Sequence, residues 1–187
     1  MNTTVFLSGS RSIARVSPAV RERLDNIMQC SLSVIIGDAN GADKALQRAL
    51  ADAAYEPVTI FAAGDKCRNN LGGWETRFIK TRPGLKGRDF YAQKDKAMAS
   101  AADYGFVLWD GESAGSIGNA LELIHQGKPA LIWFAPEKAF HKIKYIPDLE
   151  ALLNRCDRAA YQGLEQKIHL ARTLRDMRTA AQPSLTL

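Results

Sequence analysis

The chain has 187 residues, of which 46% are hydrophobic, and a formal net charge of +5. This length suits one domain with a buried core, so no disulfide staple is needed. The three cysteines lie far apart without any C-x-x-C pairing, which argues against a disulfide framework and against a zinc site. The first apolar run, residues 5–7, is far too short to span a membrane. We therefore expect a cytoplasmic protein with no bound metal, no cofactor and no membrane partner.

Short apolar runs of strand type alternate with segments of helical period along residues 3–135. Ser17 followed by Pro18 is typical of a helix start, and Gly127 followed by Pro129 is typical of a helix end. The expected strands are residues 3–8, 32–36, 58–62, 104–109 and 128–134. This alternation predicts an α/β fold with a Rossmann-like open parallel sheet of about five strands, in the order 3-2-1-4-5, with helices on both faces.

The segment from residue 64 to residue 89 shows neither helical nor strand periodicity. Lysine and arginine outnumber aspartate and glutamate by nine to four between residues 64 and 96. A loop of this length in a compact domain is usually functional or disordered, and Trp74 favours a partly ordered basic lid in which its ring stacks on a base. The lid residues with donors suited to phosphates or base edges are Arg68, Asn69 and Asn70. The alternative is a solvated basic surface.

Two parts of one domain are expected along the chain. Residues 1–147 are predicted to form a Rossmann-like nucleotide-binding domain that includes the lid, and residues 148–187 a C-terminal helical extension. Apolar residues recur at helical spacing from Tyr161 to Met177 and form one stripe. That stripe could pack on the same core or on another subunit, so the sequence leaves a homo-oligomer open.

Three turns rich in small residues follow the first, second and fourth expected strands. In the expected order, the carboxyl ends of strands one and four lie side by side where the strand order reverses. The last turn leads into a helix expected to begin near Gly115 and Ser116, whose free N–H groups and dipole favour an anion. We therefore expect a phosphate-bearing ligand at this edge of the sheet. The turn residues expected to bind it are Gly9, Ser10, Arg11, Gly37, Asp38, Asn40, Gly41, Asp43, Trp109, Gly111, Ser113, Gly115, Ser116 and Asn119.

Three of these side chains have alternative roles. The guanidinium of Arg11 suits two phosphate oxygens at once, or a structural salt bridge. The carboxylate of Asp43 suits a ribose hydroxyl, or is simply stabilised by the first turn of its helix. The ring of Trp109 stacks on a base at the pocket mouth, or is buried at the end of its strand.

Two sets of motifs resemble those of the SLOG superfamily, which joins the DNA-processing Smf/DprA proteins to the lonely-guy phosphoribohydrolases. Residues 7–11 and 36–43 resemble the "GSR" and "sGgA-x-G-x-D" elements of DprA-type and related proteins. Residues 98–103 and 115–119 resemble the lonely-guy "K-x-x-M-x-x-x-A-D" helix and "G-G-x-G-T-x-x-E" loop. The resemblance covers roughly residues 3–135 and implies a Rossmann-like fold that binds nucleotides.

The lonely-guy resemblance also implies cleavage of the bond between a base and ribose 5′-monophosphate, by an arginine and a glutamate. Here those positions are Lys94 and Asn119. A carboxylate stabilises the positive charge that develops at the sugar, whereas a neutral amide does not. Asp110 and Glu112 lie in the same turn and could replace the missing carboxylate, Asp110 being nearer the rigid strand. The candidate catalytic residues are therefore Asp110, Glu112 and Lys94.

The sequence thus predicts a protein that binds a nucleotide, a nucleotide sugar or another nucleotide-derived metabolite. It would act as a ligand sensor, or as a hydrolase or transferase of N-glycosidic bonds. The alternative is a DprA-like module whose basic loop grips single-stranded nucleic acid while aromatic side chains stack on bases. The small-ligand interpretation is favoured, because the glycine turns suit one or a few phosphate groups and one basic loop is short for a nucleic-acid groove.

Overall fold

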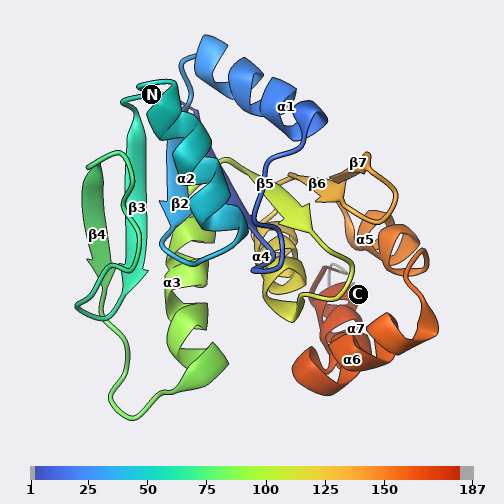
Figure 1. Ribbon diagram of the computed structural model, residues 1–187. Helices are drawn as coiled ribbons and strands as arrows, with labels where there is room; N and C mark the ends of the chain where they lie inside the picture. Colours follow the sequence, from blue (N-terminus) through green and yellow to red (C-terminus); the bar gives the residue numbers. More distant parts are fainter. Residues whose placement is uncertain (1–2, 182–187) are drawn as a thin grey trace, which may run out of the picture.

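The computed structural model describes residues 3–181. Within this range one sheet has the strand order β4-β3-β2-β1-β5-β6-β7, and helices cover it (Figure 1). The strands are β1 (Thr4–Gly9), β2 (Ser33–Gly37), β3 (Val58–Ala63), β4 (Glu75–Ile79), β5 (Tyr104–Trp109), β6 (Ala130–Phe134) and β7 (Ala139–Ile143). The helices are α1 (Pro18–Gln29), α2 (Ala42–Asp52), α3 (Gly87–Ala101), α4 (Ala114–His125), α5 (Ile146–Leu153), α6 (Arg158–Ile168) and α7 (Leu170–Ala181). All neighbouring strands are parallel except β6 and β7, so the fold is a Rossmann-like open α/β sheet.

The expected order 3-2-1-4-5 is that of the five central strands, β3-β2-β1-β5-β6. The prediction of about five strands was too low, because an edge strand was missed on each side of the sheet. β4 exposes Glu75 and Arg77, and β7 exposes Lys142, so neither segment forms a continuous apolar run. Edge strands commonly carry charged residues that discourage pairing with another chain, and this removes the signal that identifies a buried strand.

The predicted lid, residues 64–89, is wrong as a single loop. Its middle part is β4, which pairs with β3, and its last residues begin α3. Trp74 does not extend outward to stack on a base: its Nε1 donates to the carbonyl oxygen of Tyr55 at 2.8 Å, and its ring packs against the core beneath α1 and α2. This basic segment therefore builds the edge of the sheet.

The apolar face of each helix determines which side of the sheet it covers. Val20, Leu24 and Ile27 of α1 pack with α2 against one face of the central strands, and the side chain of Ser17 caps α1 by accepting from the backbone N–H of Val20 at 3.3 Å. α3 and α4 cover the other face, where Met98 joins the core. Their positions leave the carboxyl ends of β1 and β5 close to the N-terminal turn of α4.

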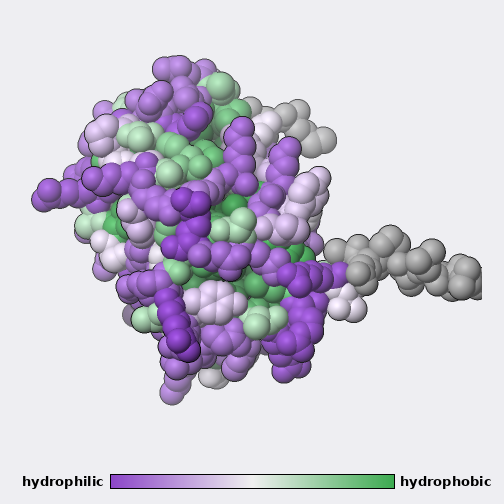
Figure 2. All heavy atoms as spheres, turned by 90° about the vertical axis from the view of Figure 1, so that its right-hand side faces the viewer, coloured by the Kyte–Doolittle hydropathy of each residue, from purple (hydrophilic) through white to green (hydrophobic). Residues whose placement is uncertain are grey.

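The C-terminal helices pack on the same core as α4. Leu149 of α5, Leu164 of α6 and Leu174 of α7 are buried in one cluster with Ile117 of α4. The apolar stripe therefore packs within the chain, while residues 182–187 of the predicted extension lie outside the described range. No helix within residues 3–181 is long and apolar enough to cross a membrane. Hydrophilic side chains predominate on the face that Figure 2 turns toward the viewer.

Candidate functional site

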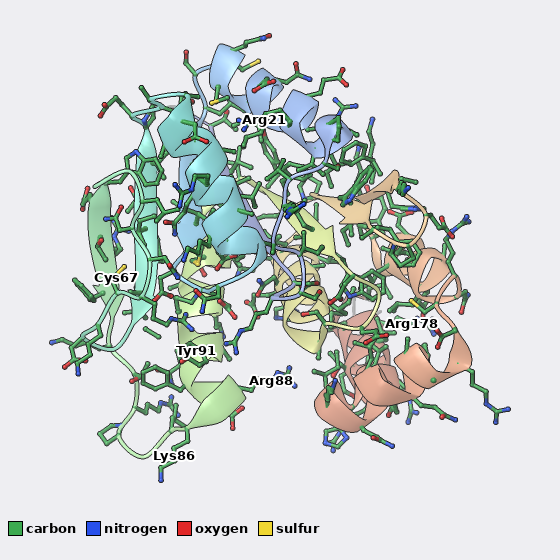
Figure 3. All side chains as sticks on the ribbon, in the orientation of Figure 1. Arg21, Cys67, Lys86, Arg88, Tyr91 and Arg178 are labelled. Atoms are coloured by element: carbon green, nitrogen blue, oxygen red, sulfur yellow. The ribbon has the colours of Figure 1, made fainter. Side chains whose placement is uncertain are left out.

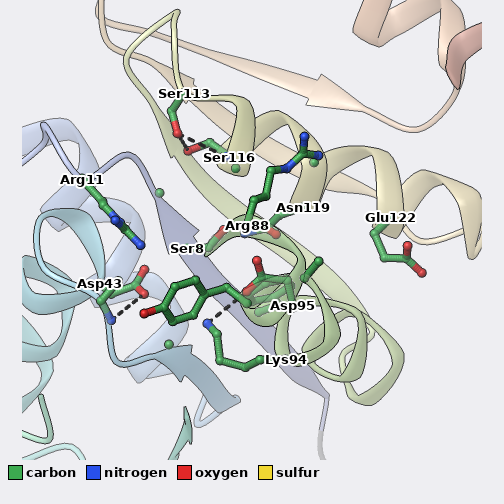
Figure 4. A pocket seen from close by; sticks show the side chains of 18 of the residues that line it. Ser8, Arg11, Asp43, Arg88, Lys94, Asp95, Ser113, Ser116, Asn119 and Glu122 are labelled. Carbon is green, nitrogen blue, oxygen red and sulfur yellow. Dashed lines mark hydrogen bonds and ion pairs between the residues drawn. The ribbon is translucent and has the colours of Figure 1, made fainter. Parts of the chain in front are cut away.

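A cavity of about 620 Å³ opens at the carboxyl ends of the central strands, bounded by α3 and α4 (Figure 4). Its walls come from the ends of β1 and β2, the first turn of α2, α3, and the turn between β5 and α4. The sequence-predicted residues that line it are Gly9, Arg11, Gly37, Asp43, Arg68, Lys94, Asp110, Ser113, Gly115, Ser116 and Asn119. The structure therefore brings together residues from all three glycine-bearing turns.

One end of the cavity is the N-terminal turn of α4. Ser113 caps this helix and accepts from the backbone N–H and the hydroxyl of Ser116, at 3.4 Å and 3.1 Å. Gly115 is exposed, and a Cβ there would have one neighbour within 4 Å, the Ser113 hydroxyl at 3.9 Å. The helix start is thus open to the cavity and can receive an anion close to its backbone.

Ser10 ties this helix start to the sheet. Its fully buried hydroxyl shares a 3.0 Å hydrogen bond with the Ser116 hydroxyl and accepts from the backbone N–H of Asp110 at 3.1 Å. It lies 3.3 Å from the carbonyl oxygen of Leu108, to which it can donate. Ser10 does not line the cavity, and its geometry is that of a cross-link between β1, β5 and α4.

Asp110 shapes the turn ahead of α4. Its Oδ2 accepts from the hydroxyl of Ser12 at 2.5 Å, and its Oδ1 accepts from the backbone N–H groups of Glu112 and Ser113 at 3.0 Å and 2.8 Å. Partial burial acts to raise the pKa of Asp110, but these hydrogen bonds outweigh it and hold the pKa below its usual value. The carboxylate is ionised and its oxygens already have donors. Glu112 is exposed and does not line the cavity.

The inner wall contains two buried charged groups, Asp43 and Lys94. The ammonium of Lys94 pairs with Asp95 at 3.0 Å, and Oδ2 of Asp43 accepts from the backbone N–H of Ala39 at 3.2 Å. Burial raises the pKa of Asp43 to about 6, against the opposing effect of Lys94. Burial also acts to lower the pKa of Lys94, but Asp95 and Asp43 outweigh it and raise that pKa, so Lys94 stays charged.

Gly37 explains how these two groups meet. A Cβ at Gly37 would lie 2.4 Å from Oδ2 of Asp43 and 2.7 Å from Nζ of Lys94. Both side chains therefore contact the same stretch of backbone at the end of β2. The glycine is required by this close approach, in addition to any contact with a ligand.

Ser8 and Asn119 complete the inner wall. Ser8 lies in β1 with 4% of its surface exposed, and its Oγ has no hydrogen-bond partner within residues 3–181. Asn119, 8% exposed, lines the same cavity from α4, one turn after Ser116. A buried hydroxyl without a partner is costly, so a cavity-lining one is a natural contact for a bound molecule.

Two arginines and a tyrosine form the rim of the cavity. Tyr91 extends from α3 (Figure 3), and its ring lies under the guanidinium of Arg68 at 4.8 Å and that of Arg11 at 5.6 Å. Arg68 also donates to both carboxylate oxygens of Asp38, at 2.9 Å and 2.6 Å. The guanidinium of Arg68 is therefore paired with Asp38. The exposed Arg11 lines the cavity at its rim.

Several expected binding residues have structural roles instead. Trp109 is fully buried and stacks on Phe134, with ring centroids 5.2 Å apart, so it does not reach the pocket mouth. At Gly41, where φ is +82°, a Cβ would lie 2.2 Å from the carbonyl oxygen of Arg11, which only glycine allows. Gly111 is buried, and a Cβ there would face Phe134 and Pro136.

Asn69 and Asn70, which were expected to contact the ligand from the lid, instead make hydrogen bonds within and between loops. Asn69 donates to the carbonyl oxygen of Asp38 at 2.8 Å and to the side chain of Asn40 at 3.0 Å. Asn70 donates to the carbonyl oxygen of Trp74 at 2.7 Å. None of Asp38, Asn40, Asn69 and Asn70 lines the cavity.

Sequence reasoning missed Ser8, Tyr91, Asp95 and Arg88. The signal for Ser8 was a polar residue at the carboxyl end of a buried strand. The other three lie in α3, which begins at Gly87, inside the segment expected to be a loop, and one face of this helix presents them to the cavity. Arg88 donates to the carbonyl oxygen of Lys167 at the end of α6, which links the rim to the C-terminal helices (Figure 3).

Among residues 3–181, no group of three or more histidine, cysteine, aspartate or glutamate side chains is arranged to hold a metal ion. In comparisons with known proteins, no family model, no curated protein and no solved structure matches the chain. The fold and the cavity thus define the protein as a Rossmann-like α/β protein with a pocket at the switch point of its sheet.

Proposed function

We propose that this protein binds a nucleotide or a nucleotide-derived metabolite in the cavity, with a phosphate group at the N-terminal turn of α4. The observation that carries the proposal is the start of α4 at Ala114 and Gly115, where Gly115 is open to the cavity beside the Ser113 hydroxyl. Free backbone N–H groups, the helix dipole and neighbouring hydroxyls together favour an anion. The guanidinium of Arg11 adds a cation at the rim.

The rest of the cavity suits a polar organic group attached to that phosphate. Its volume of about 620 Å³ is within the usual range for small-molecule sites. Its inner wall offers the hydroxyl of Ser8, the amide of Asn119 and the carboxyl of Asp43, which match the hydroxyls of a sugar and the donors and acceptors of a base. Tyr91 offers a ring at the rim.

Single-stranded nucleic acid, the DprA-like alternative, is supported less well. The basic segment that would grip a backbone contributes Arg77 to the edge strand β4, where its guanidinium lies over Phe61. Arg68 of the same segment is neutralised by Asp38. A backbone-binding groove needs a longer continuous run of free cations.

Ligand sensing is favoured over cleavage of an N-glycosidic bond, because neither Asp110 nor Glu112 is well placed to replace the missing glutamate. Asp110 is occupied by hydrogen bonds from Ser12 and two backbone N–H groups, and Glu112 lies outside the cavity. A hydrolase or transferase would have to use another carboxylate.

The proposal is tested by mass spectrometry of small molecules retained by the purified protein, followed by calorimetric titration with AMP, CMP, GMP, UMP and their nucleosides. At least one nucleotide is expected to bind, and the matching nucleoside to bind much more weakly, because it lacks the phosphate. If no nucleotide is retained and none binds, the proposal is rejected. Binding of oligonucleotides that weakens steeply with salt would instead support the nucleic-acid alternative.

A further inference from the structure

The carboxylates of the cavity differ in how fully they are occupied. Among residues 3–181, those that line it are Asp43, Asp95, Asp110 and Glu122. Asp110 accepts from a serine hydroxyl and two backbone N–H groups, Asp95 pairs with the ammonium of Lys94, and Glu122 accepts from a glutamine side chain one helical turn later. For Asp43, the described residues supply one hydrogen bond, from the backbone to Oδ2, and none to Oδ1. Asp95 Oδ2 and Glu122 Oε2 also have no donor among the described residues, but both side chains are partly exposed. Asp43, with 5% of its surface exposed, is therefore the buried cavity carboxyl that has an oxygen left for a ligand.

The charged groups around Asp43 act in opposite directions. From α3, Lys94 favours its ionised form and Asp95 disfavours it; from the end of β2, Asp38 also disfavours it. From the segment between β3 and β4, Arg68 favours the ionised form. Burial disfavours ionisation most strongly, and the balance puts the pKa of Asp43 at about 6. A carboxyl with a pKa near neutral pH changes protonation state at little cost, which is the property of groups that exchange protons with a ligand.

A phosphorylated ligand in this cavity would shift that balance in a known direction. It would displace water from the inner wall and bring negative charge into the same cavity. Both effects disfavour a second negative charge on Asp43. Its carboxyl would take one proton from solvent as the ligand enters, and no bond of the ligand would break.

We propose that Asp43 is the acid–base residue of this site: it becomes protonated when the ligand binds, and its O–H at Oδ1 then donates to an acceptor atom of the ligand, a ring nitrogen or a carbonyl oxygen. This inference rests on the proposed function, since it requires a nucleotide-derived ligand in the cavity. Lys94 keeps the free carboxyl ionised at neutral pH, so that the proton is taken up on binding.

The test is calorimetric titration with AMP at pH 6.5 in two buffers that differ in ionisation enthalpy, which gives the number of protons taken up on binding. The phosphate of AMP also titrates near this pH, so the quantity of interest is the difference between wild type and Asp43→Asn. Wild type is expected to take up roughly half a proton more than Asp43→Asn. The matched control is Asp52→Asn, an exposed residue at the other end of α2, which should behave as wild type.

Equal proton uptake by wild type and a folded Asp43→Asn variant that still binds AMP would overturn the inference and leave the proposed function intact. Failure of every nucleotide in the panel to bind would remove the proposed function and this inference with it. A measurement on the free protein applies in either case: carboxyl carbon NMR should show Asp43 titrating near pH 6. Titration of Asp43 below pH 4.5 would overturn the inference independently of any ligand.

Discussion

At the scale of single residues, buried charge is concentrated at one place, where Asp43 and Lys94 meet beside Gly37. Burying a carboxylate costs stability unless it is well paired, and Lys94, which favours the ionised form of Asp43, is paired with Asp95. The carboxyl of Asp43, whose ionised form is disfavoured by burial, therefore lies on the wall of the cavity. Such groups are common at functional sites and rare elsewhere.

Asp43→Asn is expected to stabilise the protein at neutral pH. The pKa of Asp43 is about 6 in the folded protein, above the usual 3.8, so the folded state binds more protons and loses stability as pH rises toward 6. The two pKa values correspond to a cost on the order of 3 kcal/mol once Asp43 is ionised in both states. Urea denaturation should give the variant a higher free energy of unfolding than wild type at pH 7.5. At pH 4.5 this difference between variant and wild type should be smaller by about 2 kcal/mol. An advantage independent of pH would contradict this account.

Arg11→Lys is expected to weaken AMP binding about 10-fold, and adenosine binding hardly at all. Lysine keeps the charge at the rim but loses the two-pronged geometry that matches phosphate. Calorimetric titration with both ligands measures the difference, and Arg15→Lys, an exposed arginine of the same loop outside the cavity, is the control. Equal losses for AMP and adenosine would exclude Arg11 from the phosphate site.

At the scale of elements, the site depends on how the start of α4 is joined to β1. Ser10, Ser113 and Ser116 form one chain of hydroxyl contacts, and Asp110 fixes the turn between β5 and α4. These bonds hold the helix start against the sheet while leaving Gly115 open to the cavity. The helix start that we propose as the phosphate site is thus held in place by hydrogen bonds within the protein.

Gly115→Val is expected to reduce AMP affinity about 100-fold while the protein stays folded. A Cβ at this position meets no atom closer than 3.9 Å, so the side chain fits, but it covers the backbone N–H groups that would bind phosphate. The loss corresponds to about 2–3 kcal/mol for a charge-assisted hydrogen bond. Gly163→Val in α6, where a Cβ also has free space, is the control for the effect of valine in a helix. Unchanged affinity in the folded Gly115 variant would place the phosphate elsewhere.

At the scale of the whole molecule, the C-terminal helices pack on the same core as the helix that begins at the cavity. Leu164 is fully buried in the cluster that contains Ile117 of α4, and Arg88 joins the cavity rim to the end of α6. We therefore expect a change in the packing of α5 to α7 to affect α4, at whose start we propose the phosphate site.

Leu164→Ala is expected to lower the free energy of unfolding by about 2–5 kcal/mol, the usual cost of such a cavity. Unfolding should remain a single transition in wild type and variant, because the residue packs on the common core. Denaturation followed by both tryptophan fluorescence and circular dichroism tests this, with the exposed Gln162→Ala in the same helix as control. Two separate transitions would show that the C-terminal helices unfold as an independent unit.

The sequence by itself determined the features that depend on local pattern. Continuous apolar runs identified the five central strands, whose order follows from the rules for parallel sheets. Small residues and a cap at the start of α4 identified the open helix turn, since capping depends on neighbours in the chain. Most of the turn residues expected at the cavity line it, because the turns follow parallel strands whose carboxyl ends lie at one edge of the sheet.

Only the tertiary structure decided the features that depend on contacts distant in sequence. β4 and β7 are strands because they pair with β3 and β6 at the edges of the sheet. Their exposed charged residues interrupt the apolar pattern that would predict a strand from the sequence. The sequence left Trp109 either at the pocket mouth or buried, and its packing on Phe134 decided in favour of burial. Asp43 and Lys94 lie about fifty residues apart in the chain, and their ionisation depends on the burial and the charges that the fold brings around them. The chemistry of the cavity wall is therefore a property of the folded molecule, because a pKa is determined by the neighbours that a side chain has in space.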